Sequence, residues 1–333
     1  MEVVDRYIRT RRPVSSQELA AAYRHRFSPA TIRNELLALE EEGYLRKPYP
    51  SSGRVPTAQG YRFFAHWLLD LAELEASPSR VPAERPEVEL GQVPDLYRST
   101  AAVLAAMTRE LGFVVPPPRE SVRLRGLILR RVGPGTVLAV AVSELGTAEP
   151  RFLSLDFDPT PEELLEAERF LGTWLSSHTL AEVPLLGEPV PEGWHSRAAL
   201  GALSILRKLA EPAPERNLYV EGWPQLLGEL AVRGSDWALE RGQELLRLLE
   251  EGRAFGELLG RLRAAGAGLT VHVGDGSIPE LRDLSLVAAP YLGGAGVVGV
   301  IGPLWMDYAR AYSASRYVAG RLGAILGAGK GER

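Results

Sequence analysis

Arg33 and Asn34 are adjacent residues whose side chains are suited to reading the edges of DNA bases. An arginine can form two hydrogen bonds with guanine, and an asparagine can do the same with adenine. Just before them, Ala30 and Thr31 are small enough to contact a thymine methyl group or a phosphate. These residue types together predict sequence-specific contacts with double-stranded DNA.

A helix that begins at Ser28 must carry these side chains. Ser28 is a typical N-cap residue, and Pro29 suits the first helical position. Ile32, Leu36 and Leu39 recur at helical spacing, so we expect them to form the buried side and to leave the arginine and the asparagine exposed. An ordinary amphipathic helix with a solvated polar face has the same pattern, so the flanking segments must decide between the two interpretations.

The flanking segments favour a winged helix-turn-helix. Residues 15–23 predict a short capped helix that a tight turn separates from the next one, and two such helices define the motif. Residues 44–57 predict a two-stranded wing, in which Gly53 is expected to let backbone amides approach a phosphate. The residues expected to hold the DNA backbone are Ser28, Lys47, Ser51, Ser52 and Arg54, with Tyr61 and Arg62 as outer candidates.

The charge distribution supports this interpretation. Residues 1–66 contain 11 lysines and arginines against 7 acidic residues, whereas the other 267 residues contain 27 against 35. An acidic protein with one basic end is expected to bind DNA through that end.

The composition excludes several other classes of protein. The chain has no cysteine and no apolar run of the length that spans a bilayer, and its first residues lack the apolar region of a secretory signal. We therefore expect a protein of the cytoplasm without disulfides. Its five histidines are scattered, and no catalytic constellation is assembled in the sequence, so we expect no metal, no cofactor and no enzymatic activity.

Residues 294–299 match the dinucleotide-binding pattern G-x-G-x-x-G, which makes a nucleotide-dependent enzyme an alternative. That site requires a helix directly after the glycines, so that the pyrophosphate meets the helix N-terminus. Here a β-type run ending at Pro303 follows instead. A glycine-rich hairpin turn is the better interpretation.

The remaining pattern predicts a multidomain α+β protein. A proline-rich, charged segment separates the basic end from two alternating strands, a mainly helical stretch, further strands and a closing helix, which describes an antiparallel sheet with a helical insertion. The expected ranges are 1–75 for the DNA-binding head, 76–94 for the linker, 95–158 together with 267–327 for the sheet domain, and 159–266 for the inserted domain.

Several motifs resemble those of the HrcA family of heat-inducible transcription repressors. They are SPATIRNELLALEEEGYL followed by PYPSSGRVPTAQGYRFF, then RNLYVEGWPQLL, LSLVAAPYL and VIGPLWMDYARAYSASRYVAGRL, so the resemblance covers nearly the whole chain. The chain departs from the family in its short first helix, in Tyr49 where histidine is usual, and in Leu304-Trp305 where threonine and arginine are usual.

The resemblance implies a winged helix-turn-helix, a GAF-like sheet domain and an inserted dimerisation domain. It also implies a homodimeric repressor that binds an inverted repeat upstream of chaperone operons, with its activity supported by the GroEL chaperonin. The alternative that stays open is a regulator that senses a small metabolite in a GAF-like pocket.

Overall fold

The structure of the chain is a computed structural model. It describes residues 1–24, 26–74, 93–118, 122–145, 148–176, 218–251, 255–258, 268–274 and 278–328, with isolated positions between 179 and 260. These residues form helices and antiparallel strand pairs, so the expected α+β class is confirmed. The expected linker lies almost wholly outside the described residues. Two compact units are distinguished, one with Met1–Val88, Arg98–Val114 and Tyr219–Gly320, the other with Glu89–Tyr97, Val115–Leu218 and Arg321–Arg333.

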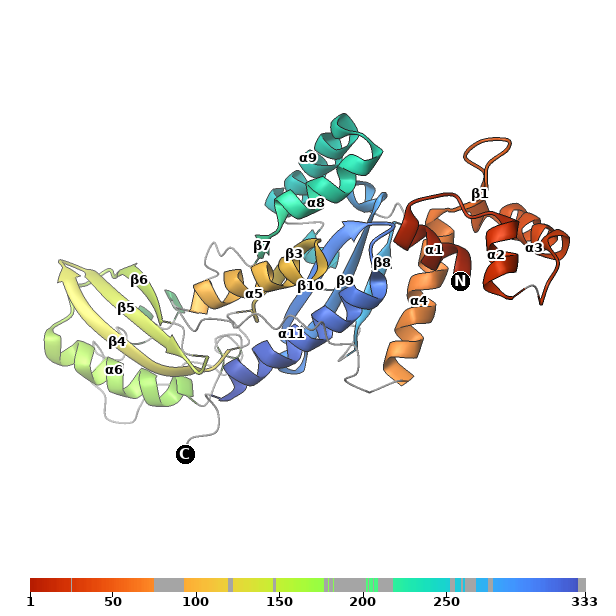
Figure 1. Ribbon diagram of the computed structural model, residues 1–333. Coiled ribbons are helices and arrows are strands. Elements are labelled where there is room, and N and C mark those ends of the chain that lie inside the picture. Colours follow the sequence, from red (N-terminus) through yellow and green to blue (C-terminus); the bar gives the residue numbers. More distant parts are fainter. Residues whose placement is uncertain are drawn as a thin grey trace. The chain divides into compact units, whose positions relative to one another are not determined.

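The N-terminal head, residues 1–74, consists of four helices and a short hairpin (Figure 1). Its elements are α1 (Glu2–Thr10), α2 (Ser16–Ala22), α3 (Pro29–Glu41), β1 (Leu45–Arg46), β2 (Val55–Pro56) and α4 (Ala58–Leu74). Ser15 and Glu18 begin α2 with a reciprocal capping box, and the hydrogen bond from the Ser15 backbone lowers the pKa of Glu18. The core of the head is a cluster of buried side chains: Val3, Val14, Leu19, Ala20, Ile32, Leu36 and Leu45.

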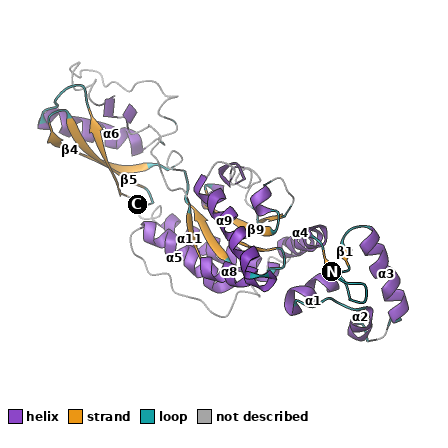
Figure 2. Ribbon diagram, turned by 90° about the horizontal axis from the view of Figure 1, so that it is seen from above, coloured by secondary structure: helices purple, strands orange, loops and turns teal. Residues whose placement is uncertain are grey.

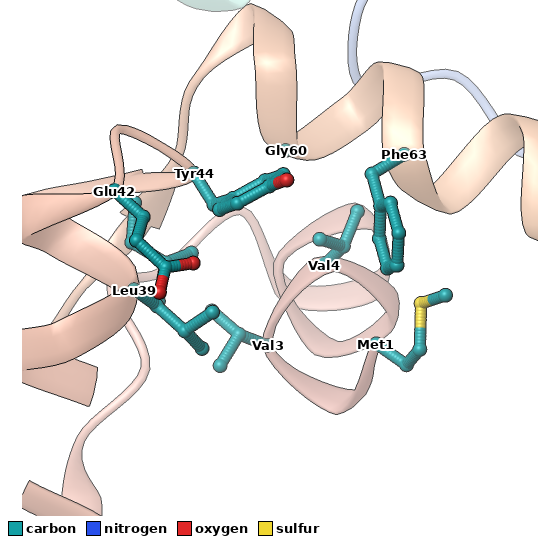
Figure 3. A pocket seen from close by; sticks show the side chains of 9 residues that line it. Met1, Val3, Val4, Leu39, Glu42, Tyr44, Gly60 and Phe63 are labelled. Carbon is teal, nitrogen blue, oxygen red and sulfur yellow. The ribbon is translucent and has the colours of Figure 1, made fainter. Parts of the chain in front are cut away.

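Leu39 corrects the expected buried stripe of α3. Ile32 and Leu36 are buried, but Leu39 is 37% exposed. It lines a cavity of about 220 Å³ together with Val3 of α1 and Phe63 of α4 (Figure 3). The helical spacing placed Leu39 on the correct side of α3, but spacing alone could not show that the facing helices leave this position partly open.

A five-stranded sheet forms the centre of the first unit, in the order β7-β3-β10-β9-β8. The strands are β3 (Leu111–Val115), β7 (Tyr219–Glu221), β8 (Thr270–Val273), β9 (Leu284–Tyr291) and β10 (Gly296–Pro303). The helices of this part are α5 (Val93–Thr108), α8 (Trp223–Leu230), α9 (Ser235–Glu251) and α11 (Tyr308–Ala328). Every residue of β10 is buried, which explains its continuous apolar and glycine-rich sequence.

The sequence pattern predicts a helix over about 95–111 and does not predict strand β3. The helix α5 ends instead at Thr108, and Arg109 follows in the left-handed conformation with φ of 63°. Glycine usually marks such a helix end, and an arginine there gives no warning in the sequence.

The second unit contains a separate three-stranded antiparallel sheet, β4 (Leu124–Gly133), β5 (Thr136–Ser143) and β6 (Ala148–Ser154). Helix α6 (Pro161–Ser176) packs against one face of it through Leu164, Leu171 and Leu175 (Figure 1). The sequence pattern predicts one sheet for 95–158 and 267–327, but the described strands form two sheets. An alternation of apolar and polar residues predicts a strand, but it does not identify the neighbouring strand with which that strand pairs.

The glycine-rich run at 294–299 belongs to the hairpin of β9 and β10, where Gly296 pairs with Tyr291 and no helix follows directly. The expected hairpin interpretation is therefore confirmed. Among the described helices, none has the length and hydropathy required to cross a lipid bilayer.

Candidate nucleic-acid interface

The start of α3 is fixed by its first residues, as the sequence predicts. The Ser28 side chain accepts a hydrogen bond of 3.0 Å from the backbone amide of Thr31, and Pro29 occupies the first turn. The hydroxyl groups of Ser28 and Thr31 also lie 2.9 Å apart and are hydrogen bonded. Ser28 therefore has a structural role as the cap, although both residues are exposed.

The exposed side of α3 presents Ala30, Arg33 and Asn34, while Ile32 and Leu36 are buried on its other side. Within the part of the chain that is described, neither Arg33 nor Asn34 is held by an ion pair or a hydrogen bond. Helix α3 lies on the opposite side of the head from α4 (Figures 1 and 2). Both side chains are therefore exposed to solvent on a helix at the edge of the head.

Leu37 shares this exposed side and was not singled out from the sequence. It is 47% exposed, although leucine at a helical position usually indicates the core. The available signal was its spacing of four residues from Arg33, which places both side chains on the same face.

The hairpin carries two further exposed candidates, Lys47 and Ser51, on a loop that projects from β1 and β2 (Figure 1). Arg46, in β1, is exposed as well. The hydroxyl group of Ser52 closes the loop, because it donates to the carbonyl oxygen of Tyr49 at 2.8 Å and accepts from the Tyr49 amide at 3.1 Å. Ser52 therefore shapes the loop that presents its neighbours.

Gly53 has a role other than the expected approach to phosphate. A Cβ atom at this position would collide with the carbonyl oxygen of Val14. The adjacent Arg54 exchanges two backbone hydrogen bonds with Val14, of 2.8 and 2.9 Å. Gly53 thus allows the hairpin to pair with the segment between α1 and α2, and this contact holds the hairpin against the head.

Arg54 itself is only 8% exposed, which corrects its expected role as a phosphate contact. Its guanidinium group forms an ion pair of 2.8 Å with Glu40 near the end of α3. The arginine therefore joins the hairpin to the helix that carries Arg33 and Asn34, and its side chain is turned toward the protein rather than toward solvent.

We expect Arg54→Ala to lower the free energy of unfolding by about 1–3 kcal/mol, because it removes a mostly buried charge-assisted hydrogen bond. Thermal and urea denaturation followed by circular dichroism measure this loss. Arg46→Ala removes an exposed arginine from the neighbouring strand, and its effect should stay within about 0.5 kcal/mol. Unchanged stability with a weaker salt dependence of DNA binding would restore Arg54 as a phosphate contact.

Tyr61 and Arg62 also lie away from the exposed face of α3, which corrects their expected outer contacts. Tyr61 is 3% exposed, and burial raises the pKa of its hydroxyl group far above the usual value. The Arg62 guanidinium donates to the backbone carbonyls of Val273, at 3.1 and 3.2 Å, and Gly274, at 2.9 Å. Arg62 therefore joins α4 to the end of β8, whereas the ring of Tyr61 packs edge-on against Tyr7 of α1, with ring centroids 6.5 Å apart.

Two further hydrogen bonds join the head to the remainder of the first unit. Arg11 donates to the carbonyl oxygen of Trp305 at 2.9 Å, and the hydroxyl group of Tyr312 donates to the carbonyl oxygen of Ala65 at 2.6 Å. The head is therefore connected to the remainder of the first unit both at the end of α1 and through α4.

The described residues offer no group of three or more histidine, cysteine, aspartate or glutamate side chains that could bind a metal ion. The surface assembled around α3 combines an arginine, an amide, a small residue and a basic hairpin. Such a surface can form hydrogen bonds and ion pairs with a nucleic acid.

A model of the protein family described as HrcA protein C-terminal domain matches residues 94–311. The chain is 32% identical over 331 residues to the heat-inducible transcription repressor HrcA of Roseiflexus sp. (strain RS-1), covering 97% of this chain and 91% of that protein. It is 29% identical over 334 residues to the protein of the same name from Carboxydothermus hydrogenoformans, and the alignment covers 98% of this chain and 96% of that protein.

A solved crystal structure, described only as that of a hypothetical protein, has a similar fold. Superposition of the two structures gives a TM-score of 0.63 at 22% sequence identity, and the similarity covers 98% of this chain and 96% of the other. At this identity the similarity concerns the fold alone.

Proposed function

The chain belongs to the HrcA family of heat-inducible transcription repressors, which are not enzymes, and on this basis we propose that it represses chaperone operons as a DNA-binding homodimer. Its operator is an inverted repeat, because a two-fold dimer presents two equivalent heads to DNA. In this proposal residues 1–74 form a winged helix-turn-helix, and the protein acts in the cytoplasm.

The observation that carries the proposal is the exposed pair Arg33 and Asn34 on α3, next to a basic hairpin. The N-terminal part of a recognition helix contacts base edges, and both residues lie within the first two turns of α3. Lys47 and Ser51 of the hairpin contact the phosphate backbone, with Ala30 and Thr31 as small contacts beside the bases.

The open face of the three-stranded sheet supports dimerisation through the second unit. Phe152 is 73% exposed and Ile128 is 40% exposed. The strand register places Phe152 opposite Leu138, and Ile128 opposite Val140, so these side chains share the face that α6 does not cover. A second copy of the chain, which the inverted repeat requires, would cover this apolar face. The five-stranded sheet of the first unit is then the GAF-like domain.

Support by the GroEL chaperonin is part of the proposal through the resemblance to the family. In this scheme, chaperonin that is free of unfolded protein favours the active repressor. When unfolded protein occupies the chaperonin, the repressor loses this support and the chaperone genes are expressed.

The purified protein should select its operator from genomic DNA fragments, which sequencing then identifies. Titration of that duplex against a scrambled duplex of the same composition should give a preference of at least about 10³-fold. Equal affinity for both duplexes would contradict the proposed function. Native mass spectrometry of the purified protein tests the metabolite-sensing alternative, which a retained small molecule would favour.

We expect Lys47→Ala to weaken binding to the operator and to unrelated DNA about equally. Loss of one phosphate contact should reduce the slope of log K against log salt concentration by about one unit. Fluorescence anisotropy at several salt concentrations measures both effects. Lys208→Ala is the matched control, because Lys208 belongs to the second unit, and this variant should leave the slope unchanged. An unchanged slope for Lys47→Ala would remove this residue from the interface.

A further inference from the structure

Leu37 is an apolar side chain on the face of α3 that otherwise carries polar residues. It is 47% exposed in the middle of the helix, whereas the neighbouring Leu36 is 6% exposed in the core of the head. Leu39 is also partly exposed, but it faces the cavity formed with α1 and α4. Leu37 is not among the residues that line this cavity, so the cavity does not account for its exposure.

The helical geometry places Leu37 between the two expected base-reading residues. Successive residues of an α-helix are turned by about 100°, so Leu37 lies about 40° around the axis from Arg33 and about 60° from Asn34, in the other direction. It is four residues beyond Arg33, which corresponds to about 6 Å along the axis. Neighbouring bases on one DNA strand are separated by about 3.4 Å, so the distance spans about two base pairs.

The next residue along this face limits what Leu37 can meet. Glu41 lies four residues further and is exposed, so its carboxylate would be repelled by a phosphate. Glu40 is held by Arg54 and faces the hairpin. Leu37 is therefore the last large apolar side chain of the exposed face before its acidic end, and an apolar group on a groove wall is the favourable contact for it.

In the major groove of DNA that apolar group is the 5-methyl group of thymine. We infer that Leu37 determines specificity by contacting the methyl group of a thymine about two base pairs from the base that Arg33 reads. The inference rests on the proposed function, since it requires α3 to enter the major groove. It assigns to a leucine the discrimination between thymine and the other bases at this position.

Replacement of thymine by uracil tests the contact, because it removes the methyl group and keeps the base pair. Each thymine of one operator half-site is replaced in turn, and the affinity of the unmodified protein is measured for each duplex. At the position that Leu37 contacts, uracil should weaken binding about fourfold. This factor corresponds to about 0.8 kcal/mol, the free energy of burying one methyl or methylene group.

Leu37→Ala should weaken binding to the thymine duplex at least fourfold and should abolish the difference between thymine and uracil at that position. Leu39→Ala is the matched control, since it removes a partly exposed leucine from the same helix but on a side turned by about 200°. It should retain the sensitivity to uracil. Circular dichroism of both variants checks that the head remains folded.

The outcomes separate this inference from the proposed function. If the unmodified protein shows no operator preference, the proposed function fails and the inference fails with it. If the protein prefers its operator but no uracil substitution weakens binding, Leu37 does not contact a thymine. If Leu37→Ala keeps the uracil sensitivity of the unmodified protein at every thymine of the half-site, the inference is also overturned, because other residues such as Ala30 or Thr31 would then make all the methyl contacts.

Discussion

Replacing Phe152 with aspartate is expected to convert the proposed dimer to a monomer and to weaken operator binding by about 10²–10⁴-fold. Phe152 is 73% exposed on the apolar face of the three-stranded sheet, where a carboxylate would have to be desolvated against a second copy of the chain. When a dimer has bound one half-site, its second head binds the other half-site at a high effective concentration. A monomer lacks this advantage, which accounts for the expected loss of affinity.

Analytical ultracentrifugation measures the oligomeric state, and anisotropy with a complete operator and with a single half-site measures the binding. Affinity for the half-site should remain unchanged, since Phe152 lies far from α3 in the sequence and belongs to the other unit. Phe152→Leu keeps an apolar side chain and should remain dimeric. Val232→Asp places the same charge at an exposed apolar position of the first unit and should also remain dimeric. A dimeric Phe152→Asp protein would show that another surface joins the two copies.

Arg33→Ala and Asn34→Ala should each cost about 1–3 kcal/mol of operator binding, which corresponds to about 5- to 150-fold in affinity. Each loss should be confined to one base pair per half-site, because a paired set of hydrogen bonds to one base is removed. Competition titrations with operators changed at single positions should show that discrimination disappears at that position alone.

Arg33→Lys provides a sharper control than alanine. Lysine keeps the positive charge but lacks the planar group with two parallel donors, so discrimination should fall while the salt dependence stays the same. If both Arg33→Ala and Asn34→Ala bind operator and scrambled DNA with unchanged selectivity, α3 does not read the bases.

Local rules of helix formation were sufficient to locate the candidate interface. Ser28 and Pro29 fixed the start of α3, and the spacing of Ile32 and Leu36 determined which side would be buried. Arg33 and Asn34 are consequently exposed as expected. All of these predictions depend on residues within one or two helical turns, where the sequence contains the necessary information.

The errors concern residues whose partners are distant in the sequence. Arg54 and Arg62 look like phosphate contacts because arginine is usually exposed, but their partners are Glu40, Val273 and Gly274. A single sequence does not reveal such pairings. The division of the strands between two sheets was missed for the same reason, since the alternation of β4 and β5 fits any antiparallel neighbour.

Besides the ion pair of 3.5 Å between Arg11 and Glu229, the hydrogen bonds described between the head and the remainder of the first unit are accepted by main-chain atoms. Arg11, Arg62 and Tyr312 all donate to carbonyl groups, including that of Trp305. Every amino acid supplies such an acceptor, so evolution can exchange the acceptor residues without losing these bonds. The carbonyl group at 305 is present whichever side chain stands there, so the bond from Arg11 does not depend on the tryptophan side chain.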